Sequence, residues 1–116
     1  MQDFQIGQRI TARRIQVFGA VNTYQQIAPN PNRVGISIQS QDVNCRIYNN
    51  EGKTSGTHWR ELSGSGVNSY AYLSSKDYGD NVTGTIYLRS TEDALSANVW
   101  EYVIDPQISQ IINGEL

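Results

Sequence analysis

Residues 33–40 read Arg-Val-Gly-Ile-Ser-Ile-Gln-Ser, and this stretch decides the fold class because apolar side chains occupy every second position in it. A side-chain period of two is typical of a half-buried β-strand. The alternation predicts two faces for this strand. The apolar face consists of Val34, Ile36 and Ile38, and the opposite face consists of Arg33, Gly35, Ser37 and Gln39.

The following stretch, residues 43–48, repeats the alternation after a short polar break. Only Gln41 and Asp42 stand between Ser40 and this second run. Two alternating runs with a two-residue separator indicate a β-hairpin. We therefore predict that 33–40 and 43–49 pair as antiparallel strands whose core-facing side chains are Val34, Ile36, Ile38, Val43, Cys45 and Ile47.

Further period-two runs predict more strands along the chain. They lie at 70–73, 86–89 and 99–104, with shorter candidates at 14–18, 24–27 and 58–62. Glycine- and asparagine-rich turns separate the runs, and no segment of helical period lies between them. This pattern predicts an all-β fold, an antiparallel β-sandwich that is jelly-roll-like and has about seven or eight strands. A closed barrel is the alternative.

At 116 residues the chain has the length of one domain. We assign the sandwich to residues 13–104, between an extended N-terminal arm (1–12) and a C-terminal tail or short helix (105–116). Asp105-Pro106 is suited to start a helix, but so short a helix needs a surface to pack on. We expect the ends to form an assembly interface in a homo-oligomer, most simply a trimer, through Phe4, Ile6, Arg9, Ile10, Arg13, Arg14, Ile108, Ile111 and Ile112.

Charge argues against a polyanionic partner, since charged residues make up 17% of the chain and the formal net charge is -2. Arg9, Arg13 and Arg14 form the one basic cluster, and we expect carboxylate pairs or an interface anchor there. No stretch has membrane-spanning length, and the N-terminus lacks a signal-peptide pattern. We therefore expect no nucleic-acid partner and no membrane.

The residues that catalysis or metal binding needs are scarce. His58 is the only histidine and no Gly-x-Ser-x-Gly motif accompanies it, while Cys45, the only cysteine, is expected to be a buried small hydrophobe. Asp77, Asp80 and Asn81 lack the spacing of a calcium loop, so we interpret them as a turn. The sequence predicts a non-enzymatic protein with no catalytic residues, metal or cofactor.

Aromatic residues suggest a rival function. Side chains of this kind can stack on sugar rings, although about half of those on strands should fill the core or pair across strands. A carbohydrate-binding module of the same sandwich type therefore stays open, with candidate stacking residues Tyr48, Tyr70, Tyr72, Tyr87, Trp100 and Tyr102.

Residues 27–38, Ile-Ala-Pro-Asn-Pro-Asn-Arg-Val-Gly-Ile-Ser-Ile, resemble a segment of small virion proteins of tailed bacteriophages. The strand at 43–48, the turn at 77–79 and the strand at 83–87 continue the likeness in order, over roughly residues 13–104, whereas residues 60–66 depart from it. The resemblance implies a jelly-roll-like sandwich in a virion assembled in the host cytoplasm. Its implied roles are capsid decoration or cement protein, head-fibre base, or tail or baseplate component, with the major capsid protein among its partners.

Overall fold

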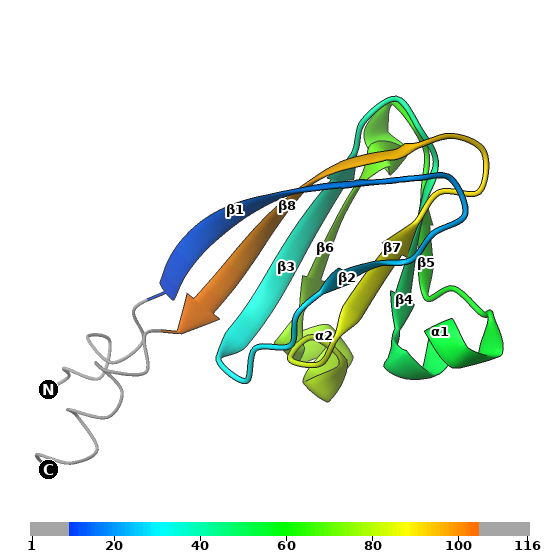
Figure 1. Cartoon of the computed structure of the whole chain (residues 1–116). Helices are drawn as coiled ribbons and strands as arrows, with labels where there is room; N and C mark the ends of the chain where they lie inside the picture. Colours follow the sequence, from blue (N-terminus) through cyan, green and yellow to red (C-terminus); the bar gives the residue numbers. More distant parts are fainter. Residues whose placement is uncertain (1–9, 105–116) are drawn as a thin grey trace, which may run out of the picture.

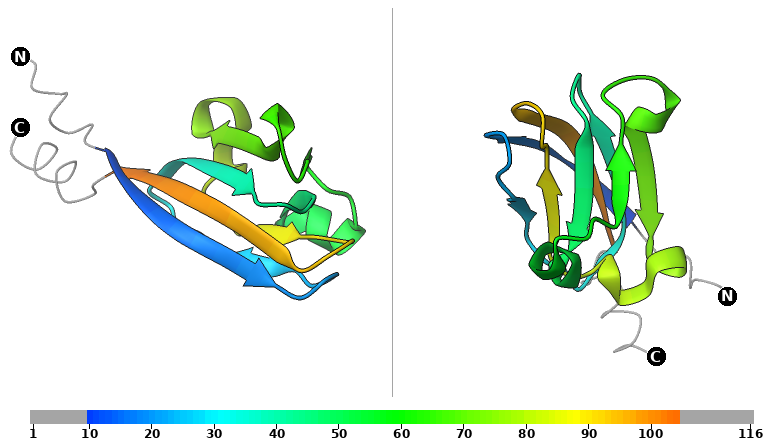
Figure 2. Two further views of the ribbon diagram at one scale, coloured as in Figure 1. Left: turned by 90° about the horizontal axis from the view of Figure 1, so that it is seen from above. Right: turned by 90° about the vertical axis from the view of Figure 1, so that its right-hand side faces the viewer.

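The computed structural model describes residues 10–104, in which two antiparallel four-stranded sheets form a β-sandwich (Figures 1 and 2). The eight strands and their antiparallel pairing confirm the all-β prediction. The long sheet has the order β1 (Ile10–Gly19), β8 (Leu95–Ile104), β3 (Arg33–Ser40) and β6 (Tyr70–Ser74). The short sheet has the order β2 (Gln25–Ile27), β7 (Ile86–Arg89), β4 (Cys45–Asn49) and β5 (Arg60–Leu62).

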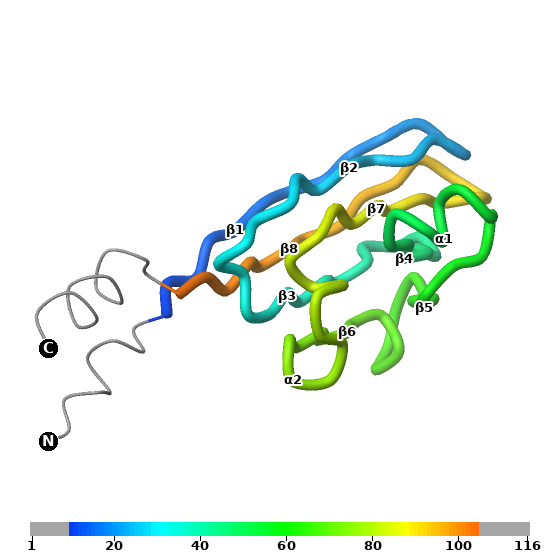
Figure 3. The backbone as a smooth tube through the Cα atoms, turned by 90° about the horizontal axis from the view of Figure 1, so that it is seen from below, coloured from blue at the N-terminus to red at the C-terminus, as the bar shows by residue number. Residues whose placement is uncertain are grey.

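Short helices occupy segments where the sequence indicated only turns. The longest follows β4, and another follows β6 (Figure 3). The Asn49 side chain accepts a 2.6 Å hydrogen bond from the Gly52 amide, and Gly56 ends the helix with a φ of 80°. The helical segments are α1 (Asn50–Ser55), η2 (Val67–Ser69), α2 (Ser75–Tyr78) and η3 (Gly79–Asn81).

The longest strands are β1 and β8, which pair over their whole length, from Ile10 opposite Ile104 to Gly19 opposite Leu95. Because β1 begins at Ile10, the last three residues of the 1–12 segment are strand. The chain therefore enters and leaves the described domain at the same end of the long sheet (Figure 1).

The predicted hairpin between 33–40 and 43–49 is wrong, because β3 and β4 belong to different sheets. Residues 41–44 cross from the long sheet to the short sheet, and backbone hydrogen bonds connect this segment to the long sheet and to the loop beyond β5 of the short sheet. The Gln41 amide donates to Ser96 O at the start of β8, and the Asp42 amide donates to Gly64 O beyond β5, both at 2.9 Å. A two-residue type I′ hairpin needs positive φ at both central residues, whereas only Asp42, at 62°, has it here.

The core faces of the two strands agree with the alternation nonetheless. Ile36, Ile38, Cys45 and Ile47 are fully buried, and the two valines are half-buried. Strands that face each other across a sandwich bury the same alternate positions as strands of one hairpin, which is why the sequence did not separate the two. The core residues are Val17, Ile27, Ile36, Ile38, Cys45, Ile47, Leu62, Ala71, Leu73, Val82, Ile86, Leu88, Leu95, Ala97 and Val99.

Arg33 is a second correction, since it lies in the core and not on the polar face of its strand. The pairing of β3 with β8 shifts register between Arg33 and Gly35. This β-bulge turns Arg33 to the same side as Ile36, and only 1% of the residue stays exposed. Strict period-two alternation predicts that Arg33 lies on the outer face of the sheet, because such a pattern takes no account of the extra residue that the β-bulge inserts into β3.

The buried Arg33 guanidinium joins the two sheets at the end where the chain enters. Nη1 donates to Glu101 Oε2 on β8 at 2.6 Å. The other hydrogen bonds go to carbonyl oxygens of segments next to short-sheet strands, with Nε to Val82 at 2.7 Å, Nη2 to Gly84 at 2.7 Å and Nη1 to Ala28 at 3.0 Å. A charge this deeply buried is tolerated because nearly all its donors have partners.

We expect Ile36→Ala to lower the free energy of unfolding by about 2–5 kcal/mol, because the truncation leaves a cavity in the centre of the core. Val34→Ala, at the bulge and only half-buried, should cost clearly less. Urea denaturation of both variants checks this. Equal losses would show that β3 is not a central core strand.

We expect Arg33→Ala to cost about 3–5 kcal/mol, because it leaves the Glu101 carboxylate buried without its main partner. Arg13 is the matched control: it donates to the other Glu101 oxygen at 2.7 Å, but its side chain is 67% exposed. Arg13→Ala should cost about 1 kcal/mol or less, as exposed ion pairs do. Comparable losses in the two variants would contradict the assignment of the buried pair.

Candidate functional site

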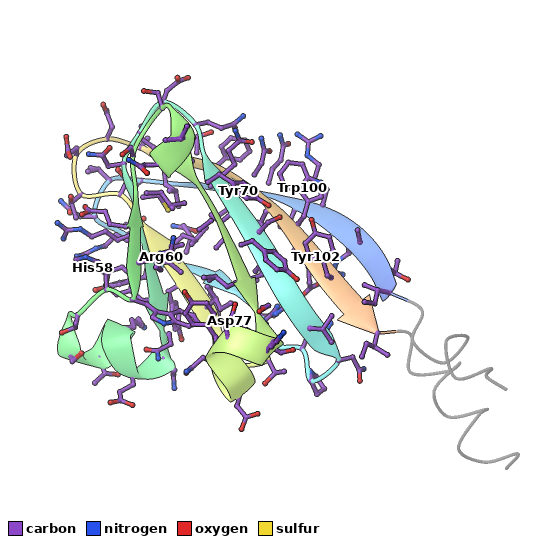
Figure 4. The ribbon with its side chains drawn as sticks, turned by 180° about the vertical axis from the view of Figure 1, so that it is seen from behind. His58, Arg60, Tyr70, Asp77, Trp100 and Tyr102 are labelled. Atoms are coloured by element: carbon purple, nitrogen blue, oxygen red, sulfur yellow. The ribbon has the colours of Figure 1, made fainter. Side chains whose placement is uncertain are left out.

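The outer face of the long sheet carries five aromatic side chains. Phe18, 62% exposed, lies on the edge strand β1 opposite Ser96. The other four lie on β6 and β8, and we call them the aromatic face: Tyr70, Tyr72, Trp100 and Tyr102. Tyr70 and Tyr72 on β6 are 48% and 49% exposed. Trp100 and Tyr102 on β8 are partly exposed, and β3 runs between the two aromatic strands. Figure 4 shows Tyr70, Trp100 and Tyr102 on this side of the sheet. The sandwich therefore presents one broad, ring-covered surface.

Strand register fixes how the aromatic face is arranged. On β3, Ser37 stands opposite Trp100 on one side and opposite Tyr72 on the other. In the next row, Gly35 stands opposite Tyr102. Small residues on the middle strand thus lie between large rings on its neighbours. The sequence did not reveal this, because the arrangement depends on which strands are neighbours.

The outer face of the short sheet is partly covered by contacts among tyrosines and cationic side chains. Tyr48 is fully buried there, although it points away from the core. The Arg89 guanidinium carbon lies 4.7 Å from the Tyr24 ring centroid and 5.3 Å from that of Tyr48, and Arg89 Nη2 donates to the Tyr48 hydroxyl at 2.8 Å. Lys53 of α1 lies 4.8 Å from the Tyr87 ring centroid. Tyr48 is thereby left without exposed ring surface, while Tyr24 and Tyr87 each lie beside a cation and stay partly exposed.

His58 lies beside a polar hollow of about 450 Å³ at the end of β4 and is in edge contact with Tyr48, with ring centroids 6.3 Å apart. A second hollow of about 530 Å³ lies between α1 and the 80–85 segment and is lined mainly by amides and hydroxyls. The hollow beside His58 is also lined by Asn49, Glu51 and Thr57, whereas His58 does not line the second hollow. Both linings offer polar binding groups.

The Asp77–Asn81 segment forms helix caps and turns. The Ser74 side chain accepts a hydrogen bond from the Asp77 amide at 3.2 Å at the start of α2, while Asp80 and Asn81 belong to η3. Across residues 10–104, no group of three or more His, Cys, Asp and Glu side chains gathers as a metal site needs. The segment is helical where the sequence predicted a turn.

The predicted assembly residues fall into two groups. Ile10 is 54% exposed at the start of β1. Arg13 and Arg14 lie on opposite faces of that strand and do not act as one basic cluster. Arg13 pairs with Glu101, and Arg14 donates to Asn98 Oδ1 at 3.2 Å while its guanidinium carbon lies 5.8 Å from the Trp100 ring centroid. The remaining residues lie outside the described range, namely Phe4, Ile6, Arg9, Ile108, Ile111 and Ile112.

Comparisons of the chain with protein-family models, curated proteins and solved structures find no match. Among the helices of residues 10–104, none has the length and apolar character needed to cross a membrane.

Burial raises the pKa of the Cys45 thiol from 9.0 to about 12, and a backbone hydrogen bond at Arg89 lowers it by a smaller amount. Since the unfolded thiol ionises first, the contribution of Cys45 to stability is complete below pH 9.0 and is lost as the pH rises toward about 12. We expect the free energy of unfolding to fall more steeply over this window in the wild type than in Cys45→Ala. Denaturation curves measured across the window check this, and equal slopes would contradict it.

Proposed function

We propose that the protein is a non-enzymatic structural protein of a phage virion, either a capsid decoration or cement protein or a head-fibre protein. Its partners are the major capsid protein and further copies of itself, most simply in a trimer. The sequence support is the resemblance of residues 27–38 to small virion proteins of tailed phages. In this role, the protein acts through a surface that attaches to the virion.

The observation that carries this proposal is the pairing of Ile10 with Ile104. It brings the first and last described residues to one end of the domain, which we call the ribbon end (residues 10–12 and 102–104). Ile10 is 54% exposed, while Val103 and Ile104 are only partly buried. Exposed aliphatic residues at the point where two terminal segments leave a domain favour attachment through that end.

The finer architecture that we propose is a jelly roll. Successive strands alternate between the sheets except at β4 and β5, which gives the orders β1-β8-β3-β6 and β2-β7-β4-β5. These orders follow from folding a long antiparallel ribbon over itself, with β1 beside β8 and β2 beside β7. Eight-stranded jelly rolls occur in viral capsid proteins and lectins, so this architecture suits the proposed role.

We expect attachment to depend on the ribbon end. Deleting 105–116, or introducing Ile10→Asp, should weaken co-sedimentation with particles of the major capsid protein from the same genome by roughly tenfold or more, which is at least about 1.4 kcal/mol. The thermal midpoint of the sandwich should change little, because Ile10 lies outside the core cluster.

Val67→Asp is the matched control for this experiment. Val67 is also apolar and is 92% exposed, but it precedes β6 at the opposite end of the long sheet. This variant should still co-sediment, and light scattering should give the mass of a trimer for both the wild type and Val67→Asp. Attachment that survives both ribbon-end changes, or that Val67→Asp reduces equally, would overturn the proposal.

A further inference from the structure

The aromatic face has the composition of a ligand-binding platform. Three successive rows of outward-facing residues cross the long sheet from β1 to β6, in register from strand to strand. Their members are Gln16, Asn98, Gln39 and Tyr70; Arg14, Trp100, Ser37 and Tyr72; Ala12, Tyr102, Gly35 and Ser74. Arg14 is the only charged side chain among them. The surface thus combines aromatic rings with neutral amides and hydroxyls.

Gly35 allows the Tyr72 ring to lie across the middle strand. A β-carbon at Gly35 would stand 2.5 Å from the Tyr72 hydroxyl oxygen and 3.0 Å from two ring carbons. The ring therefore occupies the space that any other residue would fill, and it remains 49% exposed. It meets Tyr102 edge-on, with ring centroids 5.8 Å apart. Aromatic cover over a strand glycine is a known means of stabilising a sheet, and here it also leaves ring surface accessible.

Polar side chains contact the aromatic rings and lie beside them on the sheet. Ser37 is 1% exposed, and its hydroxyl lies 3.3 Å from that of Tyr102. Asn98 Oδ1 accepts hydrogen bonds from Arg14 at 3.2 Å and from Gln16 at 3.4 Å. The Asn98 amide nitrogen has no hydrogen-bond partner among the described residues, and 6% of the residue stays exposed. An oriented amide beside Trp100 can therefore still donate to a ligand.

The chemistry of this surface matches a neutral pyranoside. A sugar ring presents C–H groups on its faces and hydroxyls around its rim. The electron-rich faces of aromatic rings attract such C–H groups, and amides can pair with the hydroxyls. A platform with one charge among these rows is complementary to an uncharged ligand. Single-stranded nucleic acid also stacks on aromatic rings, but it requires a positively charged track, which Arg14 alone does not supply.

We propose that the aromatic face binds a neutral oligosaccharide, with Trp100 and Tyr72 as the stacking residues and Asn98 as a hydrogen-bond donor. Two strand spacings separate β8 from β6, about 10 Å, so the ligand runs across the strands and covers more than one sugar ring. The site shares Tyr102 and Ala12 with the ribbon end, but Trp100, Tyr72 and Asn98 lie outside it, and the variants that test the two sites are different residues. A failure of sugar binding and a failure of capsid attachment are therefore independent results.

The two tryptophans provide an internal control for the test. Cellopentaose, maltopentaose, laminaripentaose and chitopentaose are titrated to millimolar concentration into the full-length protein labelled with ¹⁵N. At least one should shift the Trp100 indole N–H signal. The Trp59 indole should not shift, because Trp59 packs on Tyr78 beside β5, with ring centroids 4.8 Å apart.

Variants then test the assigned residues. Trp100→Ala and Tyr72→Ala should each weaken binding of the active sugar by tenfold or more. Tyr87→Ala, which removes a partly exposed tyrosine from the short sheet, should not weaken it. Gly35→Ala keeps all four rings but displaces Tyr72, so it should also weaken binding. If Gly35→Ala does not fold, the comparison of Tyr72→Ala with Tyr87→Ala decides the question.

Several results would overturn the proposal. One is that none of the four sugars shifts Trp100. Another is that Tyr87→Ala reduces binding as much as Tyr72→Ala does. A Trp100 shift caused by raising the protein concentration alone would assign the face to self-association, and a shift caused only by oligothymidine would assign it to nucleic acid.

Discussion

The buried ion pair between Arg33 and Glu101 is the constraint on which the rest of the structure depends. Glu101 belongs to the central part of the long sheet, and the Arg33 guanidinium also holds carbonyl oxygens next to β2 and β7 of the short sheet. Each interaction fixes the position of one sheet relative to the other. Because leaving either charge unpaired in the core is costly, the packing of the sheets, the bulge in β3 and the start of β7 must form together.

The bulge at Arg33 also explains the composition of the aromatic face. It reverses the side-chain direction once, so that the positions after it present Gly35 and Ser37 outward and the isoleucines inward. Without the bulge, Arg33 would lie on the outer face and add a second charge beside the rings. One extra residue in β3 thus accounts both for the buried ion pair between Arg33 and Glu101 and for the low charge of the aromatic face.

Much of the fold was predictable because period-two alternation is a local property of the chain. The positions of the strands and the burial of Ile36, Ile38, Cys45 and Ile47 follow from it directly. The pairing of the strands could not be predicted from the alternation, because two strands of one hairpin and two strands in opposite sheets show the same period-two pattern. The two arrangements are distinguished by long-range contacts of the 41–42 segment, namely the hydrogen bonds of Gln41 to Ser96 and of Asp42 to Gly64.

The candidate site was less predictable for the same reason. The sequence identified the aromatic residues as a group, but it could not tell that Tyr48 is enclosed by Arg89 and Tyr24 while Tyr72 lies open over Gly35. Each outcome depends on a neighbour that is distant in the chain. The basic pair at Arg13 and Arg14 was misjudged for a different reason. Adjacent strand residues face opposite sides, but the strand predicted at 14–18 did not include Arg13, which lies in β1.

The position of β8 has a consequence for biosynthesis. This strand lies between β1 and β3 in the long sheet, so the first and third strands to leave the ribosome are joined only by the last. Until Leu95–Ile104 emerges, β1 has no partner in its own sheet, and the Arg33 side chain lacks its carboxylate. Pairing of such distant segments is slow to form. The nascent chain therefore completes its fold after translation of the domain, and it carries unpaired strand edges until then.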